Sequence, residues 1–238
     1  MFRRSRDPRQ ARFLTWASLR WVWANRAWTP HYLVRYWRLL VLRVRHPDVV
    51  LTGYVSLGRR VRIQTSPGYG RIVLGRWVHL GDGSALRCHD GRLRIGDKVV
   101  FGQGVTVNCF LDVEIGAASM VADSVYVCDF DHRFADLSLP VKDQGIVKTP
   151  VRIGPDVWIG TKATVVRGSV LGQGAVVGAN AVVTGVVPAY AVAVGIPARV
   201  VASRLPAGLP SRRWRGRLGS RSRLGVLRQA ASRARKKY

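Results

Sequence analysis

The sequence predicts an all-β solenoid of stacked parallel strands, because an aliphatic residue returns every six positions between Val151 and Ala202. A period of six fits neither the 3.6-residue turn of a helix nor the simple alternation of a flat sheet. It fits a coil in which each hexad supplies one short strand and one turn. Glycine follows four of these residues, and we expect it to supply a positive φ at the turn. A small or β-branched residue stands four positions after each aliphatic one. The six aliphatic positions are Ile153, Ile159, Val165, Leu171, Val177 and Val183.

This repeat resembles that of the hexapeptide-repeat acyltransferases, over roughly residues 55–202 and most clearly over 151–200. The resemblance is closest to the sugar O-acetyltransferases of the maltose and galactoside type and to their relatives that modify bacterial polysaccharides. It implies a left-handed parallel β-helix, whereas the general rule for parallel crossovers alone would favour a right-handed one. It also implies acetyl-CoA as co-substrate and a homotrimer whose sites lie between two solenoids.

The first segment, residues 1–48, is basic, rich in tryptophan and predicted to be helical after an Arg-rich stretch at 1–15. Two helices are expected between Trp16 and Arg45, with a break near Pro30, because proline is suited to a first helical turn. Such helices can lie in the headgroup region of a membrane or cover the open end of the solenoid, and the two roles are compatible. We expect no spanning helix, since no stretch reaches about 18 apolar residues, and no secretory signal.

The net charge of +26 is concentrated at the two ends of the chain. Residues 1–47 carry 11 Lys or Arg and one acid, and residues 204–238 carry 12 and no acid. Such ends indicate an anionic partner such as lipid, nucleic acid or glycan, or else a solubilising tail. We expect contact with an anionic membrane surface rather than nucleic acid. Residues 203–238 are predicted to be a mostly disordered basic tail, with a short basic helix at 218–235.

The β-helix is expected over residues 49–202, with imperfect hexads at its start and one interruption at 128–150. A long loop within a regular solenoid is costly to order and is often functional. Three cysteines, Cys88, Cys109 and Cys128, are too few for a disulfide framework. Their spacing, close to one coil, predicts a buried stack of small apolar residues in a reducing cytoplasm.

His132, early in the interruption, is the expected general base. A hydroxyl is a poor nucleophile at neutral pH, and a positioned imidazole can take its proton as the new bond forms. A lone loop histidine is by itself more often a surface residue, but its position resembles that of the catalytic histidine of the maltose-type enzymes. Asp129 and Asp131 either orient the ring or are exposed turn acids. Asp131 is also a candidate substrate contact.

Two further residues are expected on the acceptor side. Asn108 lies one coil before the interruption and resembles the second residue of the family's Asn-x-Asn motif, whose first position is Thr106 here. It can hold the acceptor, or it can belong to a turn or an asparagine ladder. Asp112 lies near the family's acceptor-contacting acid, although the turn here is about two residues shorter.

The thioester is expected to bind along a second group of residues. Trp158 points outward by alternation with Val157 and Ile159. The resemblance places it beside the pantetheine channel, with Thr161, Ala179 and Thr184 contacting acetyl-CoA. Thr161 and Ala179 are 18 residues apart, so they are expected to stack on successive coils. The family's lysine after Thr184 is Gly185 here, and Arg199, with Arg204 as a further candidate, is expected to meet the CoA phosphates.

The predicted function is therefore acetyl-CoA-dependent O-acetyl transfer to a sugar or glycan hydroxyl, which can be lipid-linked, by a cytoplasmic protein peripheral at the inner membrane face. An amino-sugar acceptor and a longer acyl donor remain open. A rival hypothesis is a non-catalytic solenoid that binds anionic lipid or nucleic acid through its basic ends. We expect no metal: His79 and His89 do not match the spacing of the zinc-binding branch of these solenoids.

Overall fold

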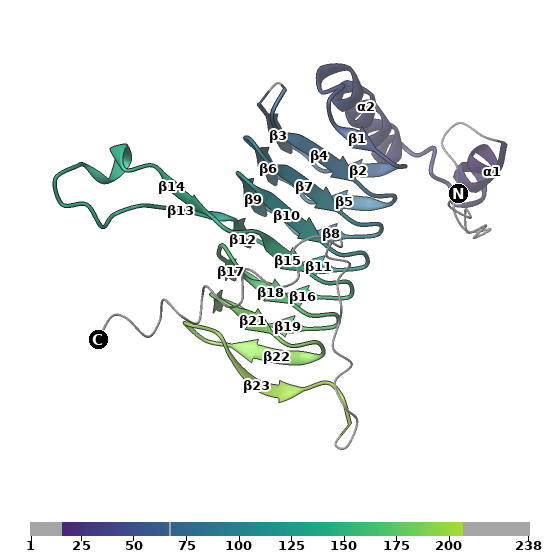
Figure 1. Ribbon diagram of the computed structural model, residues 1–238. Coiled ribbons are helices and arrows are strands. Elements are labelled where there is room, and N and C mark those ends of the chain that lie inside the picture. The colour runs from purple at the N-terminus through teal and green to yellow at the C-terminus, as the bar shows by residue number, and fades with distance from the viewer. Residues whose placement is uncertain (1–15, 67, 207–238) are drawn as a thin grey trace, which may run out of the picture.

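The computed structural model describes residues 16–66 and 68–206, which form two helices followed by a parallel β-solenoid (Figure 1). Helix α1 spans Trp16–Ala24 and α2 spans Pro30–Arg45. Proline lies in the first turn of α2, where a missing backbone N–H costs nothing, so the predicted two-helix segment is confirmed. No helix in the described part of the chain is long and apolar enough to cross a membrane. The expectations for residues 1–15, for the basic tail beyond residue 206 and for its helix at 218–235 lie outside the described residues.

Three sheets form the faces of the solenoid, and successive coils add their strands to these faces in turn. All the strands within these sheets pair in parallel except the last pair of the second face. The first face contains, in spatial order, β1 (Val50–Leu51), β4 (Arg71–Leu74), β7 (Arg92–Ile95), β10 (Asp112–Ile115), β15 (Val151–Ile153), β18 (Val170–Leu171) and β21 (Val186–Val187). The second face contains β2 (Val55–Leu57), β5 (Val78–Leu80), β8 (Val100–Phe101), β11 (Met120–Val121), β16 (Trp158–Ile159), β19 (Val176–Val177), β22 (Ala191–Val194) and β23 (Arg199–Ser203). The third face contains β3 (Arg62–Thr65), β6 (Ala85–Cys88), β9 (Thr106–Cys109), β12 (Tyr126–Cys128), β17 (Thr164–Val165) and β20 (Val182–Val183).

The hexad residues fill the interior as predicted. All six aliphatic positions from Ile153 to Val183 are buried, and so are the small residues at the corners, such as Ala163 and Ala175. Each aliphatic residue stacks on its counterpart in the next coil, for example Ile159 on Val177. The core is therefore a column of side chains along the solenoid axis.

The glycines that follow the hexad aliphatics correct one expectation. We expected them to supply a positive φ at the turns, but Gly160 and Gly172 do not adopt one. A Cβ on Gly160 would lie 2.6 Å from the backbone nitrogen of Ala179 in the next coil, so glycine is required by the close approach of the coils. The positive φ falls two residues later, at Lys162 and at Gly174.

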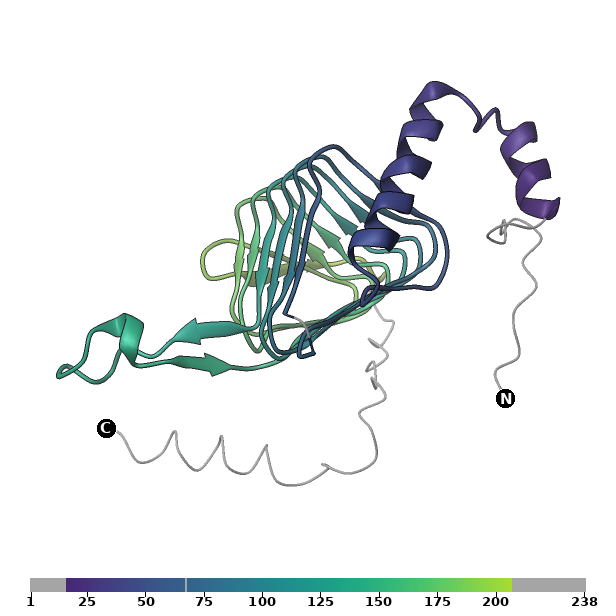
Figure 2. The same ribbon diagram turned by 90° about the horizontal axis from the view of Figure 1, so that it is seen from above.

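The solenoid is interrupted once, after β12. Here β13 (Phe130–His132) pairs antiparallel with β14 (Ile146–Lys148), with a 3-10 turn at Val141–Asp143 between them. We call residues 130–148 the arm. It projects from the corner between the third and first faces, as the view from above shows (Figure 2).

The two ends of the solenoid are finished differently. At the first coil, α2 lies against β2, with Arg35 bonded to Ser56 and Arg38 to the carbonyl of Leu57. At the last coil, β23 turns back and pairs antiparallel with β22, which ends the parallel stacking. A helix thus covers the first coil, and an exposed antiparallel strand continues the second face beyond the last coil.

Candidate active site

His132 lies at the end of β13, where the arm leaves the solenoid, opposite Ile146 of β14. Its side chain is exposed, and its ring lies 6.1 Å from that of Phe130 in an edge-on arrangement. The strand preceding the arm pairs Cys128 with Asn108, so Asn108 belongs to the neighbouring coil at the same corner. We call this corner, between the third and first faces, the arm edge.

Asp129 anchors the arm to the coil before it. Its carboxylate is fully buried and accepts hydrogen bonds from the backbone N–H groups of Phe110 (2.8 Å), Leu111 (2.8 Å) and Asp112 (2.7 Å). A buried carboxylate tolerates the loss of water when several donors surround it. The sequence left two interpretations of Asp129, a residue that orients the ring of His132 or an exposed turn acid. Both were wrong, because Asp129 is buried and binds the backbone of the preceding coil.

Asn108 takes part in a polar and aromatic cluster at the arm edge. Its Oδ1 lies 3.1 Å from Nε2 of His89, and its Nδ2 lies 3.5 Å from the hydroxyl of Tyr126. The ring of His89 stacks on Phe110 at 4.1 Å, and Phe110 contacts Phe130 at 4.5 Å. These contacts hold the Asn108 amide at the surface beside the base of the arm.

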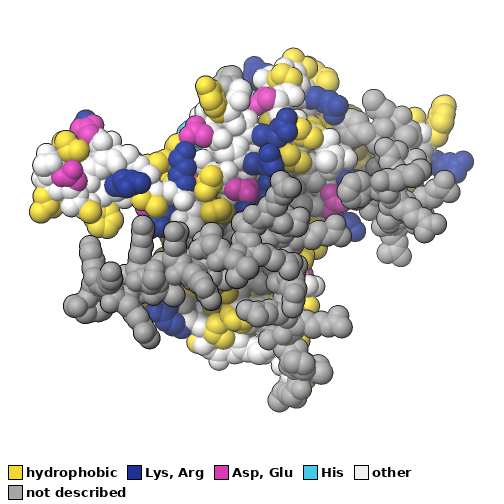
Figure 3. Space-filling view, in the orientation of Figure 1, with side chains coloured by type: hydrophobic (Ala, Val, Ile, Leu, Met, Phe, Trp, Pro, Cys, Tyr) yellow, Lys and Arg dark blue, Asp and Glu magenta, His cyan; other side chains and the backbone are white. Residues whose placement is uncertain are grey.

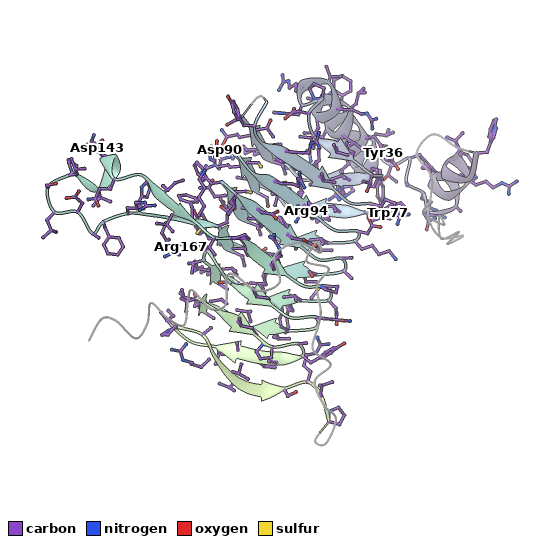
Figure 4. The ribbon with its side chains drawn as sticks, in the orientation of Figure 1. Tyr36, Trp77, Asp90, Arg94, Asp143 and Arg167 are labelled. Carbon is purple, nitrogen blue, oxygen red and sulfur yellow. The ribbon has the colours of Figure 1, made fainter. Side chains whose placement is uncertain are left out.

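Asp131 is paired with an arginine and not with the imidazole that it was expected to orient or assist. Its carboxylate pairs with Arg167, which extends from the next coil to the base of the arm (Figure 4). Both residues line a cavity of about 540 Å³ beneath the arm, together with His132 and Gln144. Within the described residues, the ring of His132 has no hydrogen bond to either aspartate, so its orientation depends on the arm itself.

The carboxylate of Asp112 forms ion pairs with arginines on the solenoid wall. Its carboxylate lies 3.0 Å from Nη2 of Arg94 and pairs more closely with Arg152, which also lies 4.0 Å from the carboxylate of Glu114. Arg94 also lies 2.9 Å from the carboxylate of Glu114. Figure 3 shows Lys or Arg side chains close to acidic ones on the part of the surface that faces the viewer. The short turn that separated Asp112 from the family pattern thus places it in an ion-pair network of the solenoid wall. Its role as an acceptor contact stays a prediction.

The residues expected to hold the thioester lie at another corner. Trp158 points outward as predicted, with 50% of its surface exposed. Thr161 and Ala179 follow β16 and β19 at the edge between the second and third faces, which we call the Trp158 edge, and both are exposed. They stack on successive coils, as the hydrogen bond of 2.9 Å from the N–H of Asn180 to the carbonyl of Thr161 shows.

The remaining thioester candidates are spread along the C-terminal coils. Thr184 is exposed and follows β20 at the arm edge. Arg199 begins β23 and is exposed, with one hydrogen bond of 3.1 Å to the carbonyl of Ala198. Arg204 is less available to a CoA phosphate than expected, because it already donates to the carbonyl of Gly174 (2.7 Å) and lies 3.5 Å from the carboxylate of Asp156.

One chain does not bring all these residues together. His132 and Asn108 lie at the arm edge, and Trp158, Thr161 and Ala179 lie at the Trp158 edge. The third face separates the two edges, so its outer surface stands between the base and the groove. A site that uses both groups requires the Trp158 edge of another subunit beside the arm edge of this one.

The cysteines do not offer a nucleophile at this site. Cys88 and Cys109 stack as predicted, but Cys128 is one position out of register and pairs with Asn108, so the three-residue stack was wrong. All three thiols are buried. Burial raises the pKa of the Cys128 thiol, the one nearest the arm, and so keeps it protonated. The described residues contain no group of three possible metal ligands.

Three residues at the arm edge were missed as site residues from the sequence. Phe110 and Arg167 carry no motif, and His89 was considered only as a zinc ligand. The spacing of one coil was the available signal for His89, which precedes Asn108 by 19 residues. For Arg167 this signal is hidden, because the arm lies within the 36 residues that separate it from Asp131. Their side-chain contacts depend on how far each turn bulges, which the spacing does not reveal.

The comparisons with known proteins agree with this architecture. Residues 150–185 match the family model described as bacterial transferase hexapeptide (six repeats). The chain is 56% identical over 201 residues to the probable acetyltransferase Rv3034c of Mycobacterium tuberculosis, covering 84% of this chain and 67% of that protein. It is 32% identical to WbbJ of Escherichia coli, described as a candidate lipopolysaccharide biosynthesis O-acetyl transferase, covering 65% of this chain and 84% of that protein.

Among solved structures, the fold is similar to that of AntD, an N-acyltransferase from Bacillus cereus. The S84A variant of AntD, in complex with dTDP-4-amino-4,6-dideoxyglucose and coenzyme A, superposes with a TM-score of 0.59 at 20% identity. The match covers 69% of this chain and 89% of AntD. At this identity the likeness concerns the fold.

Proposed function

Because this chain belongs to the hexapeptide-repeat acetyltransferases, we propose that it moves an acetyl group from acetyl-CoA to a hydroxyl of a sugar or glycan, with His132 as general base. The observation that carries the proposal is the single interruption of the solenoid. It carries an exposed imidazole at the edge that also holds Asn108, while an outward tryptophan and two stacked turns lie at another edge.

The proposed reaction proceeds by direct attack. A nitrogen of His132 accepts the proton of the acceptor hydroxyl as its oxygen attacks the thioester carbonyl. A backbone N–H donates to the oxyanion that forms. When this intermediate collapses, the carbon–sulfur bond breaks and the CoA thiolate takes the proton from the imidazolium. No covalent acyl-enzyme is required, in keeping with the burial of all three thiols.

We propose that each complete site forms between two subunits of a homotrimer. One subunit supplies the arm edge with His132 and Asn108, and the next supplies Trp158, Thr161 and Ala179 for the pantetheine arm. A cyclic trimer repeats one such pairing three times with a single kind of contact. Thr184 and Arg199, on the later coils, are the proposed contacts to the rest of acetyl-CoA.

The acceptor is proposed to be a sugar hydroxyl of a glycan close to the membrane. WbbJ, with 32% identity, is described as acting in lipopolysaccharide biosynthesis, which makes a cell-envelope saccharide the first acceptor class to test. We place the protein on the cytoplasmic side, peripheral to the inner face of an anionic membrane. The buried free thiols suit a reducing compartment, and the basic ends suit anionic lipid.

The decisive experiment measures the release of free CoA thiol from acetyl-CoA with a panel of soluble saccharides. Wild-type protein is expected to release thiol with at least one saccharide, and His132→Ala is expected to lose about 10²- to 10⁴-fold in kcat. His31→Ala, an exposed histidine on α2, is the matched control and should keep full activity. Full transfer by His132→Ala would contradict the proposal.

A further inference from the structure

Helix α2 exposes the kind of surface that a helix normally buries. Its side facing the solenoid holds Arg35, which donates to Ser56 at 2.5 Å, and Arg38, which donates to the carbonyl of Leu57 at 3.1 Å. Leu39 and Leu42 are the buried residues of the helix. The anchoring is therefore partly polar, although the helix carries several other large apolar residues.

Those other apolar residues point into solvent. On α2 they are spaced by four, three and four residues, which places them in one stripe along the helix. On α1, exposed apolar residues are spaced by three and four. The stripe on α2 is formed by Leu33 (54% exposed), Trp37 (63%), Leu40 (54%) and Val44 (73%), and that on α1 by Trp16 (85%), Leu19 (57%) and Trp23 (77%). We call these seven residues the outer helical surface.

The segment that carries this surface has positive charge alone. Residues 16–47 contain six arginines and no acidic residue. Arg20, Arg26, Arg43 and Arg45 are exposed, and Trp28 in the connection stacks on Trp23 at 6.2 Å. Indole and leucine side chains bordered by arginines are the pattern of helices that lie in the headgroup region of a bilayer.

A second copy of the chain fits this surface less well. Two outer helical surfaces that face each other would bring the arginines of both copies together. No acid within residues 16–47 would neutralise them. Like charges placed across an interface oppose association. Anionic headgroups supply the missing negative charge and an apolar layer at the same time.

We propose that the outer helical surface docks on an anionic lipid bilayer, with the indole and leucine side chains in the interface and the arginines at the phosphates. The solenoid then stands on the membrane by its first coil. Strands β3, β6, β9 and β12 are successive neighbours on the third face, at about 4.8 Å each, so the arm leaves the solenoid roughly 15 Å beyond that coil. The inference does not depend on the proposed reaction.

The test is co-sedimentation of the full chain with vesicles of phosphatidylcholine alone or mixed with a quarter of phosphatidylglycerol. The variant Leu33→Gln/Trp37→Gln/Leu40→Gln keeps every arginine and good helix formers. The control Val186→Gln/Val200→Gln/Val201→Gln changes three exposed valines in the last coils. Circular dichroism and thermal melting establish that both variants are folded.

Wild-type protein and the control are expected to bind the anionic vesicles, with their tryptophan fluorescence quenched by brominated lipid. The helix variant is expected to bind at least tenfold more weakly and to lose most of the quenching. Repeating the measurement at 0.5 M salt distinguishes two kinds of binding. Electrostatic binding through the basic tail is screened at this salt concentration, whereas binding through inserted apolar side chains persists.

Equal binding and quenching of the helix variant would overturn the proposal. So would a wild-type protein that ignores the vesicles, or one that self-associates through this surface instead. Thiol release with a soluble saccharide should be unchanged in the helix variant, so failure here is distinct from failure of the proposed reaction.

Discussion

The carboxylate of Asp129 accepts a hydrogen bond of 2.8 Å from the backbone N–H of Phe110, one coil earlier in the solenoid. Two further N–H groups of the same turn bind this carboxylate. The residue just before the arm is thereby fastened to the turn that carries the aromatic cluster at the arm edge. The position of His132, three residues later, depends on this attachment.

Replacing Asp129 with alanine is expected to destabilise the protein by roughly 3–5 kcal/mol, because three N–H groups would be left without their acceptor in a buried turn. Urea unfolding followed by circular dichroism measures the change. Asp143→Ala, at the exposed end of the arm, removes a surface ion pair to Lys142 and should cost less than about 1 kcal/mol. Equal stabilities of the two variants would show that Asp129 is not an anchor.

Mixing two inactive variants tests whether the site lies between subunits. His132→Ala removes the base, and Ala179→Trp fills the groove at the Trp158 edge. If the two edges come from different subunits, trimers reassembled from equal amounts should regain about a quarter of wild-type activity, since one site in four pairs two intact edges. Thiol release after joint refolding gives the measurement. A mixture as inactive as its parents would place both groups in one subunit.

Asp131→Asn is expected to leave the pH dependence of kcat/KM unchanged, because the carboxylate pairs with Arg167 rather than with the imidazole. The loss of a half-exposed ion pair should reduce activity by less than about tenfold through a looser arm. A pH–rate profile between pH 5 and 9 makes the comparison. A clear displacement of the profile would instead make Asp131 a partner of the catalytic ring.

The junction between α2 and the solenoid is expected to weaken in acid. Burial lowers the pKa of His79, and the nearby Arg35 lowers it further, against a smaller opposite effect of Asp82. The unfolded chain therefore binds the proton more readily than the folded one. Stability contributed by neutral His79 is complete above about pH 6.5, the usual histidine value, and declines as the pH falls toward the lower folded value.

Thermal melting between pH 5 and 7.5 measures this effect. His79→Gln should flatten the dependence of the melting temperature on pH over this range. His31→Gln is the control, since that side chain is exposed in the first turn of α2 and should leave the dependence as in wild type. If both variants and the wild type share one slope, His79 does not carry the pH dependence.

The solenoid and its interruption could be predicted because both are local in sequence. An aliphatic residue such as Ile159 recurs every six positions along the chain, and its inward position follows from the geometry of a short strand and a turn. The break at Pro30 and the outward position of Trp158 follow in the same way. The positions of the hexad glycines could also be read from the sequence, but the structural requirement for glycine there could not. That requirement is the close approach of neighbouring coils, as between Gly160 and Ala179.

The sequence by itself determined the repeat, the single loop, the histidine that this loop carries and the basic ends, since each is a pattern along one stretch of chain. Only the tertiary structure decided the partners of the charged side chains and which edge holds which residue. Asp129 is buried as an anchor, Asp112 is held by arginines, and α2 turns its apolar stripe toward solvent. These outcomes depend on how far the turns of each coil extend and on the rotation of the helix as it packs against the solenoid. The spacing of residues along one strand determines neither of them.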